Sequence, residues 1–320
     1  MKKLVECVPN FSEGRDQTKI DLIMSTLYQR EGVRVVNVES DKDYNRTVVT
    51  LIGEPEQIIE AMVPFTNQVI SSIDMNFHRG EHARMGAIDV IPFIPLENTT
   101  MKDCVEYAHQ LAALLSSTFT IPVFLYAEAA TSEERILLPN IRKGEFEGMI
   151  DKIKLPAWAP DYGKPEIHPT FGAVAIGARE FLVAYNIDIL SMDENIAKNI
   201  SKAIRKSSGG FAHIQAGPVT LENRNHTQVT MNILNYKQNP LYRIFETVIM
   251  EAARYHIQVP SAEIVGLIPK RALIDSIHYY QDVNNEEKKK EMSLDEIVIK
   301  AIQYLHLRDF TKDKIIENFL

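Results

Sequence analysis

The residues best suited to chemistry lie at positions 78–95, in the stretch HRGEHARMGAIDVIPFIP. Its first nine residues include two histidines, two arginines, one glutamate and two glycines, and they lead directly into the apolar run 87–95. This pattern predicts a polar loop that enters a buried strand. We expect Gly80 and Gly86 to adopt backbone angles denied to other residues, so that the polar side chains can point inward.

One interpretation of this loop is a metal site. His78, Glu81 and His82 spell the letters H-x-x-E-H, which place two histidines on one face of a helix in a class of zinc peptidases. Here Gly80 lies inside the motif and a strand is expected a few residues later, so a helix of useful length is not predicted. The metal interpretation therefore lacks the helix that it requires.

The other chemical interpretation makes His82 a general acid/base that acts alone. The neighbouring cations of Arg79 and Arg84 favour the neutral form of the imidazole, which suits a base. The alternative without chemistry is a partly buried histidine that only makes structural hydrogen bonds. We find no nucleophile elbow and no comparable cysteine environment that would indicate serine or cysteine catalysis.

Composition limits the classes of protein that fit. The chain has 320 residues, of which 45% are hydrophobic, enough for one large core or two modest ones. A net charge of -8 argues against nucleic-acid binding, so an anionic substrate would need a locally basic pocket. The two cysteines indicate a reducing compartment, and Pro9 interrupts the amino terminus too early for a signal peptide. We expect a cytoplasmic protein without membrane contact.

The elements that must position the loop are predicted by hydrophobic periodicity. The first half has the order strand, helix, strand, strand, helix, strand, which is the split βαβ motif of ferredoxin-like sheets. The expected segments are strands at 4–8, 33–38, 47–52 and 87–95 and helices at 18–30 and 55–72, with a kink at Pro64. A helix at 101–115 and a strand at 121–126 should extend this sheet.

The second half repeats the same order of elements. Ser191 and Glu194 are expected to form a capping box for its first helix. The expected segments are strands at 181–189, 212–221, 227–236 and 262–268, a helix that starts at 239–240 and a final helix at 294–307. We therefore predict an α/β (α+β) fold with two ferredoxin-like subdomains, residues 1–178 and 179–320.

A Gly/Pro-rich decapeptide, GKPEIHPTFG at 163–172, lies near the predicted boundary. On composition alone such a segment is a connection before a strand. Its end glycines and two prolines also allow a ligand to approach the backbone closely. If it binds a ligand, Gly172→Val should weaken binding with little effect on stability.

Three stretches together resemble one family. They are VECVPNFSEGRD, HRGEHARMGAIDVIPFIP and WAPDYGKPEIHPTFGAVAIGAREFLVAYNI. They resemble the glutamate formimidoyltransferases, which transfer a formimidoyl group from N-formimidoyl-L-glutamate to tetrahydrofolate in histidine breakdown. The resemblance covers essentially the whole chain. It implies two ferredoxin-like subdomains around a positively charged folate tunnel, commonly in a dimer. Bifunctional animal members carry a further cyclodeaminase domain, and we expect the single-activity form because 320 residues leave no room for one.

The resemblance also implies roles for particular residues. His82 would be the catalytic acid/base, with tetrahydrofolate as co-substrate and no metal. Family members usually have proline at the position of Ala83 and an aspartate near the active site where Glu39 stands. We expect Glu39 or Asp89 to orient the imidazole. The segment implied to contact folate is Gly163, Lys164, Pro165, Glu166, Ile167, His168, Pro169, Thr170, Phe171 and Gly172. The cations that could bind substrate carboxylates are Arg46, Arg79, Arg84, Lys164 and Arg179.

The implied reaction fits a single acid/base. A folate ring nitrogen attacks the formimidoyl carbon, and the tetrahedral intermediate then expels glutamate as an amine. His82, near its usual pKa of about 6.5, could accept the proton of the attacking nitrogen and return it to the leaving one. The alternatives are a folate-binding protein without catalysis and a zinc-dependent hydrolase that uses His78, Glu81 and His82.

Overall fold

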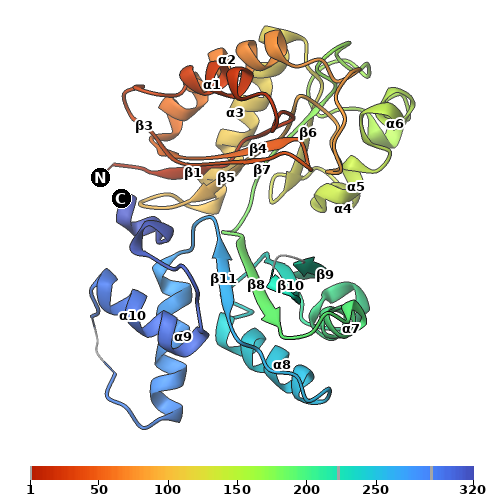
Figure 1. Ribbon diagram of the computed structural model, residues 1–320. Helices are drawn as coiled ribbons and strands as arrows, with labels where there is room; N and C mark the ends of the chain where they lie inside the picture. Colours follow the sequence, from red (N-terminus) through yellow and green to blue (C-terminus); the bar gives the residue numbers. More distant parts are fainter. Residues whose placement is uncertain (1, 222–223, 289–290) are drawn as a thin grey trace. The chain divides into compact units, whose positions relative to one another are not determined.

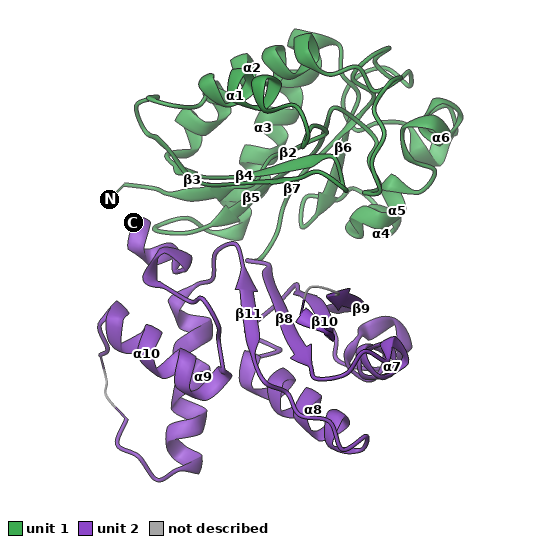
Figure 2. Ribbon diagram, viewed as in Figure 1, with its two compact units in different colours: residues 1–180 green, residues 181–320 purple. Residues whose placement is uncertain are grey.

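The computed structural model describes residues 2–221, 224–288 and 291–320 (Figure 1). Contacts between residues divide the chain into two compact units, unit 1 at Met1–Glu180 and unit 2 at Phe181–Leu320 (Figure 2). Each unit has its own sheet and its own helices.

Unit 1 is built on a sheet in which β1 and β2 together lie between β4 and β5, while β3 pairs with the other side of β4. These pairings are all antiparallel and give the strand order of the ferredoxin-like motif. Beyond β5 the sheet continues with parallel β7 and then β6. The strands are β1 (Val5–Cys7), β2 (Asn10–Phe11), β3 (Val33–Asp41), β4 (Arg46–Gly53), β5 (Ile88–Pro95), β6 (Val123–Ala127) and β7 (Val174–Ala178).

Helices cover both faces of this sheet. Three long helices lie on one face (Figure 1), where their apolar stripes meet alternate residues of β1 and β5 such as Val5 and Ile91. Strand residues that point to the other face, for example Val90 and Phe124, pack against Ile141 and Met149 of the short helices. The long helices are α1 (Gln17–Ser25), α2 (Pro55–Ser72) and α3 (Met101–Phe119); the short ones are α4 (Glu133–Ile136), α5 (Leu138–Arg142), α6 (Glu145–Lys152) and a 3-10 turn (Pro156–Trp158).

Unit 2 has a four-stranded antiparallel sheet in the order β11-β8-β10-β9, again the ferredoxin-like order. Its core contains Tyr185, Ile187, Val229 and Phe245. The strands are β8 (Val183–Ile189), β9 (Ile214–Leu221), β10 (His226–Ile233) and β11 (Ala262–Val265). The helices are α7 (Glu194–Ile204), α8 (Leu241–Ala253), α9 (Lys270–Val283) and α10 (Leu294–Leu305), with 3-10 turns at Lys206–Ser208, Lys312–Lys314 and Ile316–Phe319.

The predicted fold class and the repeated order of elements are confirmed. One detail is wrong. Asp193, rather than a Ser191–Glu194 pair, caps α7: its side chain accepts from the amide of Asn195, while Ser191 accepts from the amide of Asp193. Helices α4, α5, α6 and α9 and strand β7 were not predicted. The capping box of Ser293 and Glu296 at α10 follows the usual reciprocal pattern.

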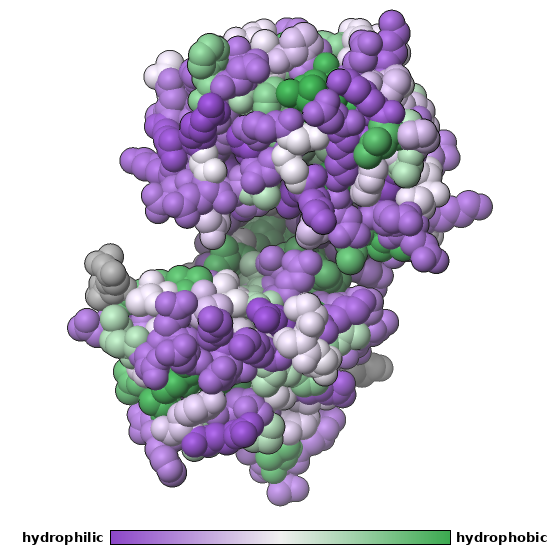
Figure 3. Space-filling model, turned by 90° about the vertical axis from the view of Figure 1, so that its right-hand side faces the viewer, coloured by the Kyte–Doolittle hydropathy of each residue, from purple (hydrophilic) through white to green (hydrophobic). Residues whose placement is uncertain are grey.

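The surface drawn in Figure 3 is mostly hydrophilic on each unit, with apolar residues in separate small patches. Such scattered exposure is normal for a folded chain. Among the helices that the structure describes, none is both long enough and apolar enough to cross a membrane.

Candidate functional site

The three motif-bearing stretches meet at Gly86 in unit 1. Ser12, from the first stretch, donates from Oγ to the carbonyl of Gly86 and from its amide to the carbonyl of Ala87, both at 2.9 Å. From the third stretch, Gly172 forms a β-bridge with Gly86, and the Phe171 carbonyl accepts from the amide of Ala87 at 2.7 Å. Two segments that are far from the central loop in the sequence thus hold it in place.

The glycines of the central loop are required for close packing. A Cβ at Gly86 would lie 2.0 Å from the carbonyl oxygen of Ala173, and one at Gly80 would lie 2.3 Å from that of Tyr44. Neither glycine has the positive φ that we expected from the sequence. That expectation is wrong because the loop needs space beside its backbone, which only glycine leaves.

His82 lies against a guanidinium. Its Nε2 is 2.5 Å from Nη1 of Arg46, its ring centroid is 5.9 Å from that of Tyr44, and its Nδ1 is buried with no hydrogen-bond partner among the described residues. Burial and the positive charges of Arg46 and Arg142 lower the pKa of His82 to about 4. The imidazole is therefore neutral across the physiological range.

Two cations and one carboxylate surround this imidazole. Asp89 is buried, accepts from the amide of Met85 at 2.9 Å and pairs with Arg142. The Nε atoms of Arg46 and Arg142 are both buried without a partner in the described chain. Arg142 lies in the short helix α5, where no pattern in the sequence marks it. The cluster carries more positive than negative charge, which favours an anionic ligand.

His78 has a different environment from His82. Its Nδ1 accepts from Nε of Arg84 at 3.3 Å, so its Nε2 donates to the carbonyl of Asn45 at 2.9 Å. Residues 79–84 form no helix. In the ranges that the structure describes, no three histidine, cysteine, aspartate or glutamate side chains are grouped to hold a metal ion. Through the bond to Asn45, the buried His78 ties the central loop to the turn between β3 and β4.

Arg84, one of the cations expected to bind a substrate carboxylate, already pairs with carboxylates of the protein. It is buried and pairs with Glu145 at 2.6 Å and with Glu147 at 2.8 Å. Both acids lie in the first turn of α6, in the segment that the sequence left without a pattern. Arg84 therefore fixes α6 to the central loop.

The carboxylates expected to orient His82 make other contacts. Glu39 is exposed and accepts from the side-chain amide of Asn37 at 3.0 Å, and Asp89 pairs with Arg142. Neither hydrogen-bonds His82 in the described structure, so that expectation is not met. Arg46 is the group in contact with the imidazole.

The other cations predicted to bind substrate carboxylates do not contact His82 in the described structure. Arg79 is exposed and donates to the carbonyls of Asn76 and His78 at 3.2 and 2.6 Å. Arg179, at the end of β7, is half-buried and donates to the carbonyl of Glu180 at 3.0 Å. Lys164 is exposed. Only Arg46 lies against His82.

The decapeptide 163–172 forms a tight turn beside the central loop. The amides and carbonyls of His168 and Gly172 pair with each other, and Nδ1 of His168 accepts from the amide of Phe171 at 3.1 Å. Gly172 has φ +85°, and a Cβ there would lie 2.3 Å from the carbonyl of Met85. The expectation that Gly172→Val would have little effect on stability is therefore wrong. The side chains of Lys164, Pro165, Glu166 and Pro169 are exposed.

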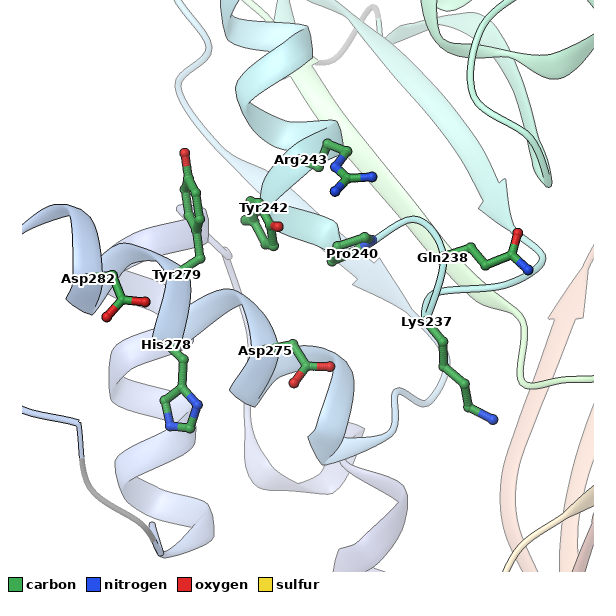
Figure 4. Close-up of a pocket in the computed structure, with 9 residues that line it drawn as sticks. All are labelled: Lys237, Gln238, Pro240, Tyr242, Arg243, Asp275, His278, Tyr279 and Asp282. Atoms are coloured by element: carbon green, nitrogen blue, oxygen red, sulfur yellow. The ribbon is translucent and has the colours of Figure 1, made fainter.

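A separate pocket of about 450 Å³ lies in unit 2, between the start of α8 and α9 (Figure 4). The rings of Tyr242 and Tyr279 stack there with centroids 3.9 Å apart. None of the residues predicted from the sequence to act in the site lines this pocket. Its lining comprises Lys237, Gln238, Pro240, Tyr242, Arg243, Asp275, His278, Tyr279 and Asp282.

Two ferredoxin-like units and a neutral histidine among cations define an α/β protein suited to acid/base chemistry on an anionic substrate. Two family models match the chain: "Formiminotransferase domain, N-terminal subdomain" over residues 4–179 and "Formiminotransferase domain" over residues 184–320. The chain belongs to the formiminotransferase family.

Curated relatives agree with this assignment. The glutamate formimidoyltransferase of Streptococcus pyogenes serotype M1 is 44% identical over 91% of this chain and 98% of its own length. The enzyme of the same name from Thermoplasma acidophilum is 42% identical over 88% of this chain and 93% of its own. The formimidoyltransferase-cyclodeaminase of Gallus gallus is 40% identical over 88% of this chain, but the match spans only 53% of that longer protein.

Proposed function

We propose that this protein transfers the formimidoyl group of N-formimidoyl-L-glutamate to tetrahydrofolate, giving 5-formimidoyltetrahydrofolate and L-glutamate, a step of histidine degradation. The two family matches and the relatives named glutamate formimidoyltransferase support this reaction. Tetrahydrofolate acts as a co-substrate. From the resemblance we also expect a homodimer, and from cysteine usage a cytoplasmic protein.

The observation that carries the mechanism is the neutral His82 in a cationic cluster. We infer that a folate ring nitrogen attacks the formimidoyl carbon while His82 accepts the proton which that nitrogen loses. The tetrahedral intermediate then collapses, and the same imidazole gives the proton to the departing glutamate nitrogen. One side chain serves both steps, so the histidine returns to its starting state.

Substrate binding involves two groups of residues in this proposal, one beside His82 and one in the decapeptide 163–172. Arg46 provides charge beside His82 for a carboxylate of the donor. The decapeptide 163–172 contacts folate, which its exposed side chains and its bridge to Gly86 support. Arg79 is a further candidate for a carboxylate because it is exposed on the same loop.

Release of L-glutamate distinguishes this function from the alternatives. A transferase should release L-glutamate from the donor only when tetrahydrofolate is present, in a one-to-one ratio with the folate product. Release of L-glutamate in the absence of folate would favour a zinc-dependent hydrolase that uses His78, Glu81 and His82, provided that a chelator abolishes the release. Folate binding without any release would indicate a folate-binding protein instead.

Replacing Lys164 tests the folate contact without disturbing the fold. Because Lys164 is exposed, Lys164→Ala should leave the melting temperature within a few degrees of the wild-type value. The same variant should bind tetrahydrofolate about 3- to 10-fold more weakly, because it lacks the charge of the lysine. Calorimetric titration measures the affinity. The matched control is Lys154→Ala, an exposed lysine that pairs with Asp151 outside this loop. Equal affinities for both variants would mean that the lysine makes no contact with folate.

The acid limb of kcat/KM tests the environment of His82. A base must be unprotonated, and burial with neighbouring cations lowers the pKa of His82 to about 4 in the free protein. We therefore expect kcat/KM to stay within about twofold from pH 7.5 down to pH 5, whereas a base of ordinary pKa would lose more than about tenfold over that interval. Circular dichroism at each pH checks that the protein stays folded. A tenfold fall would contradict the lowered pKa.

A further inference from the structure

Arg46 occupies the lone pair of His82 that the proposed catalysis requires. Its Nη1 lies 2.5 Å from Nε2 of His82. A guanidinium can only donate hydrogen bonds, so Nε2 must be the acceptor. An imidazole whose lone pair already accepts from a cation cannot also accept a proton from a reacting nitrogen. Some event must move Arg46 before His82 can act.

The groups that face His82 carry one more positive than negative charge. They are the cations Arg46 and Arg142, the carboxylate Asp89 and the phenol of Tyr44, whose ring also lies 5.9 Å from the Arg46 guanidinium carbon. Asp89 already pairs with Arg142. Asp41, opposite Arg46 in the pairing of β3 with β4, adds a negative charge near Arg46, but among the described residues no carboxylate forms an ion pair with Arg46. Both arginines have a buried Nε without a partner in the described chain, and burial together with Arg142 lowers the pKa of Arg46. Unfilled buried donors of this kind favour a ligand oxygen.

The chemistry of the donor indicates which anion belongs there. In N-formimidoyl-L-glutamate the departing nitrogen is bonded to the α carbon, which also carries the α-carboxylate. Standard bond lengths place that carboxylate carbon about 2.5 Å from the nitrogen. The group that protonates this nitrogen must therefore lie beside the cations that hold the α-carboxylate. The carboxylates of folate lie beyond its aminobenzoyl group and are not tied to the reacting nitrogen in this way.

We propose that Arg46 and Arg142 bind the α-carboxylate of the donor, and that this carboxylate draws Arg46 away from Nε2 and so frees His82 to accept a proton. The inference rests on the proposed function and adds the donor subsite to it. Binding replaces a hydrogen bond from a cation with the field of an anion, and both changes raise the pKa of His82. The base is thus available only when the substrate is in place.

The test is a titration of His82 by NMR in protein labelled with ¹⁵N-histidine, with His82→Ala used to assign the signal. N-acetyl-L-glutamate serves as the probe because it keeps the α-carboxylate and has no charged amine. We expect its saturation to raise the pKa of His82 by at least about one unit, a tenfold change in proton affinity. The matched control ligand is the α-amide of the same molecule, which keeps the side-chain carboxylate and should leave the pKa unchanged.

Variants assign the effect to the two arginines. Arg46→Gln should weaken binding of N-acetyl-L-glutamate by about 10- to 100-fold, and His82 should then titrate nearer its ordinary pKa without responding to the ligand. Arg142→Lys keeps a cation for Asp89, so this variant should fold. It should bind N-acetyl-L-glutamate about tenfold more weakly than the wild type does. Arg254→Gln in unit 2, where the arginine is exposed and pairs with Glu251, is the control and should bind as the wild type does.

The outcomes separate this inference from the proposed function. Bound N-acetyl-L-glutamate, verified by calorimetry, with an unchanged His82 pKa would overturn the substrate-driven release of His82 even if the enzyme turns over. A raised pKa that depends on Arg46, in a protein that transfers no formimidoyl group, would support the donor subsite and overturn the proposed reaction. A pKa that rises equally with the α-amide would also overturn the subsite.

Discussion

His82→Ala should lower kcat by about 10² to 10⁴, the usual loss when a positioned general acid/base is removed. The effect is large because one imidazole serves both proton transfers in the proposed mechanism. KM should change little, since Arg46 and Arg142, which form the proposed donor subsite, remain in this variant. Steady-state kinetics with each substrate varied in turn provide the measurement.

His78→Ala is the matched control for this variant. His78 is buried and hydrogen-bonded to Asn45 and Arg84, so its removal should reduce the free energy of unfolding by about 1 to 3 kcal/mol and affect kcat much less than His82→Ala. Similar losses of kcat in the two variants would indicate a shared metal site. A His82→Ala enzyme that keeps more than about a tenth of wild-type kcat would lie outside the range for acid/base catalysis.

Gly86→Ala should reduce the free energy of unfolding by about 3 kcal/mol or more, at the upper end of the range for overpacking. The new Cβ would lie 2.0 Å from the carbonyl oxygen of Ala173, a backbone atom that cannot rotate away. The bridge between Gly86 and Gly172 holds two motif stretches together, so its strain should spread across the site. Urea denaturation measures the change.

Gly148→Ala is the control for Gly86→Ala. Gly148 lies inside α6, and a Cβ there meets no atom within 4 Å. Its replacement should stabilise the protein by up to about 1 kcal/mol, because alanine favours a helix over glycine. If the free energy of unfolding of Gly86→Ala instead lies within about 0.5 kcal/mol of the wild-type value, the loop tolerates a side chain and Gly86 is not needed for close packing.

Most of the fold was predictable from the sequence because its elements have strong periods. The apolar spacing predicts α2 at the bounds observed, and the β-branched run of β4 is found within a residue at each end. Strand β7 was not predicted because its run of small residues follows a Gly/Pro-rich loop and lacks an alternating pattern. Helix α9 was missed although Leu273 and Ile277 have helical spacing and are buried.

The site was predictable only where chemistry is dense in the sequence. The loop at 78–95 was found because histidines, arginines and glycines cluster there. Asn45 was not found, yet its side chain accepts from the amide of Gly14 and donates to the carbonyl of Arg79, both at 2.9 Å. Arg142 was missed for the same reason: it contacts Asp89, which is distant in sequence. Long-range contacts of single residues leave no local pattern.

Formimidoyl transfer to tetrahydrofolate, with His82 as the proposed acid/base, can be measured directly. The most direct test incubates the purified protein with N-formimidoyl-L-glutamate and tetrahydrofolate, then acidifies the mixture and reads the absorbance of the methenylfolate that forms from the product. We expect product to accumulate with enzyme and with both substrates, and His82→Ala to be at least about 100-fold slower. No product from the folded wild-type protein, or equal rates for the two proteins, would contradict this proposal.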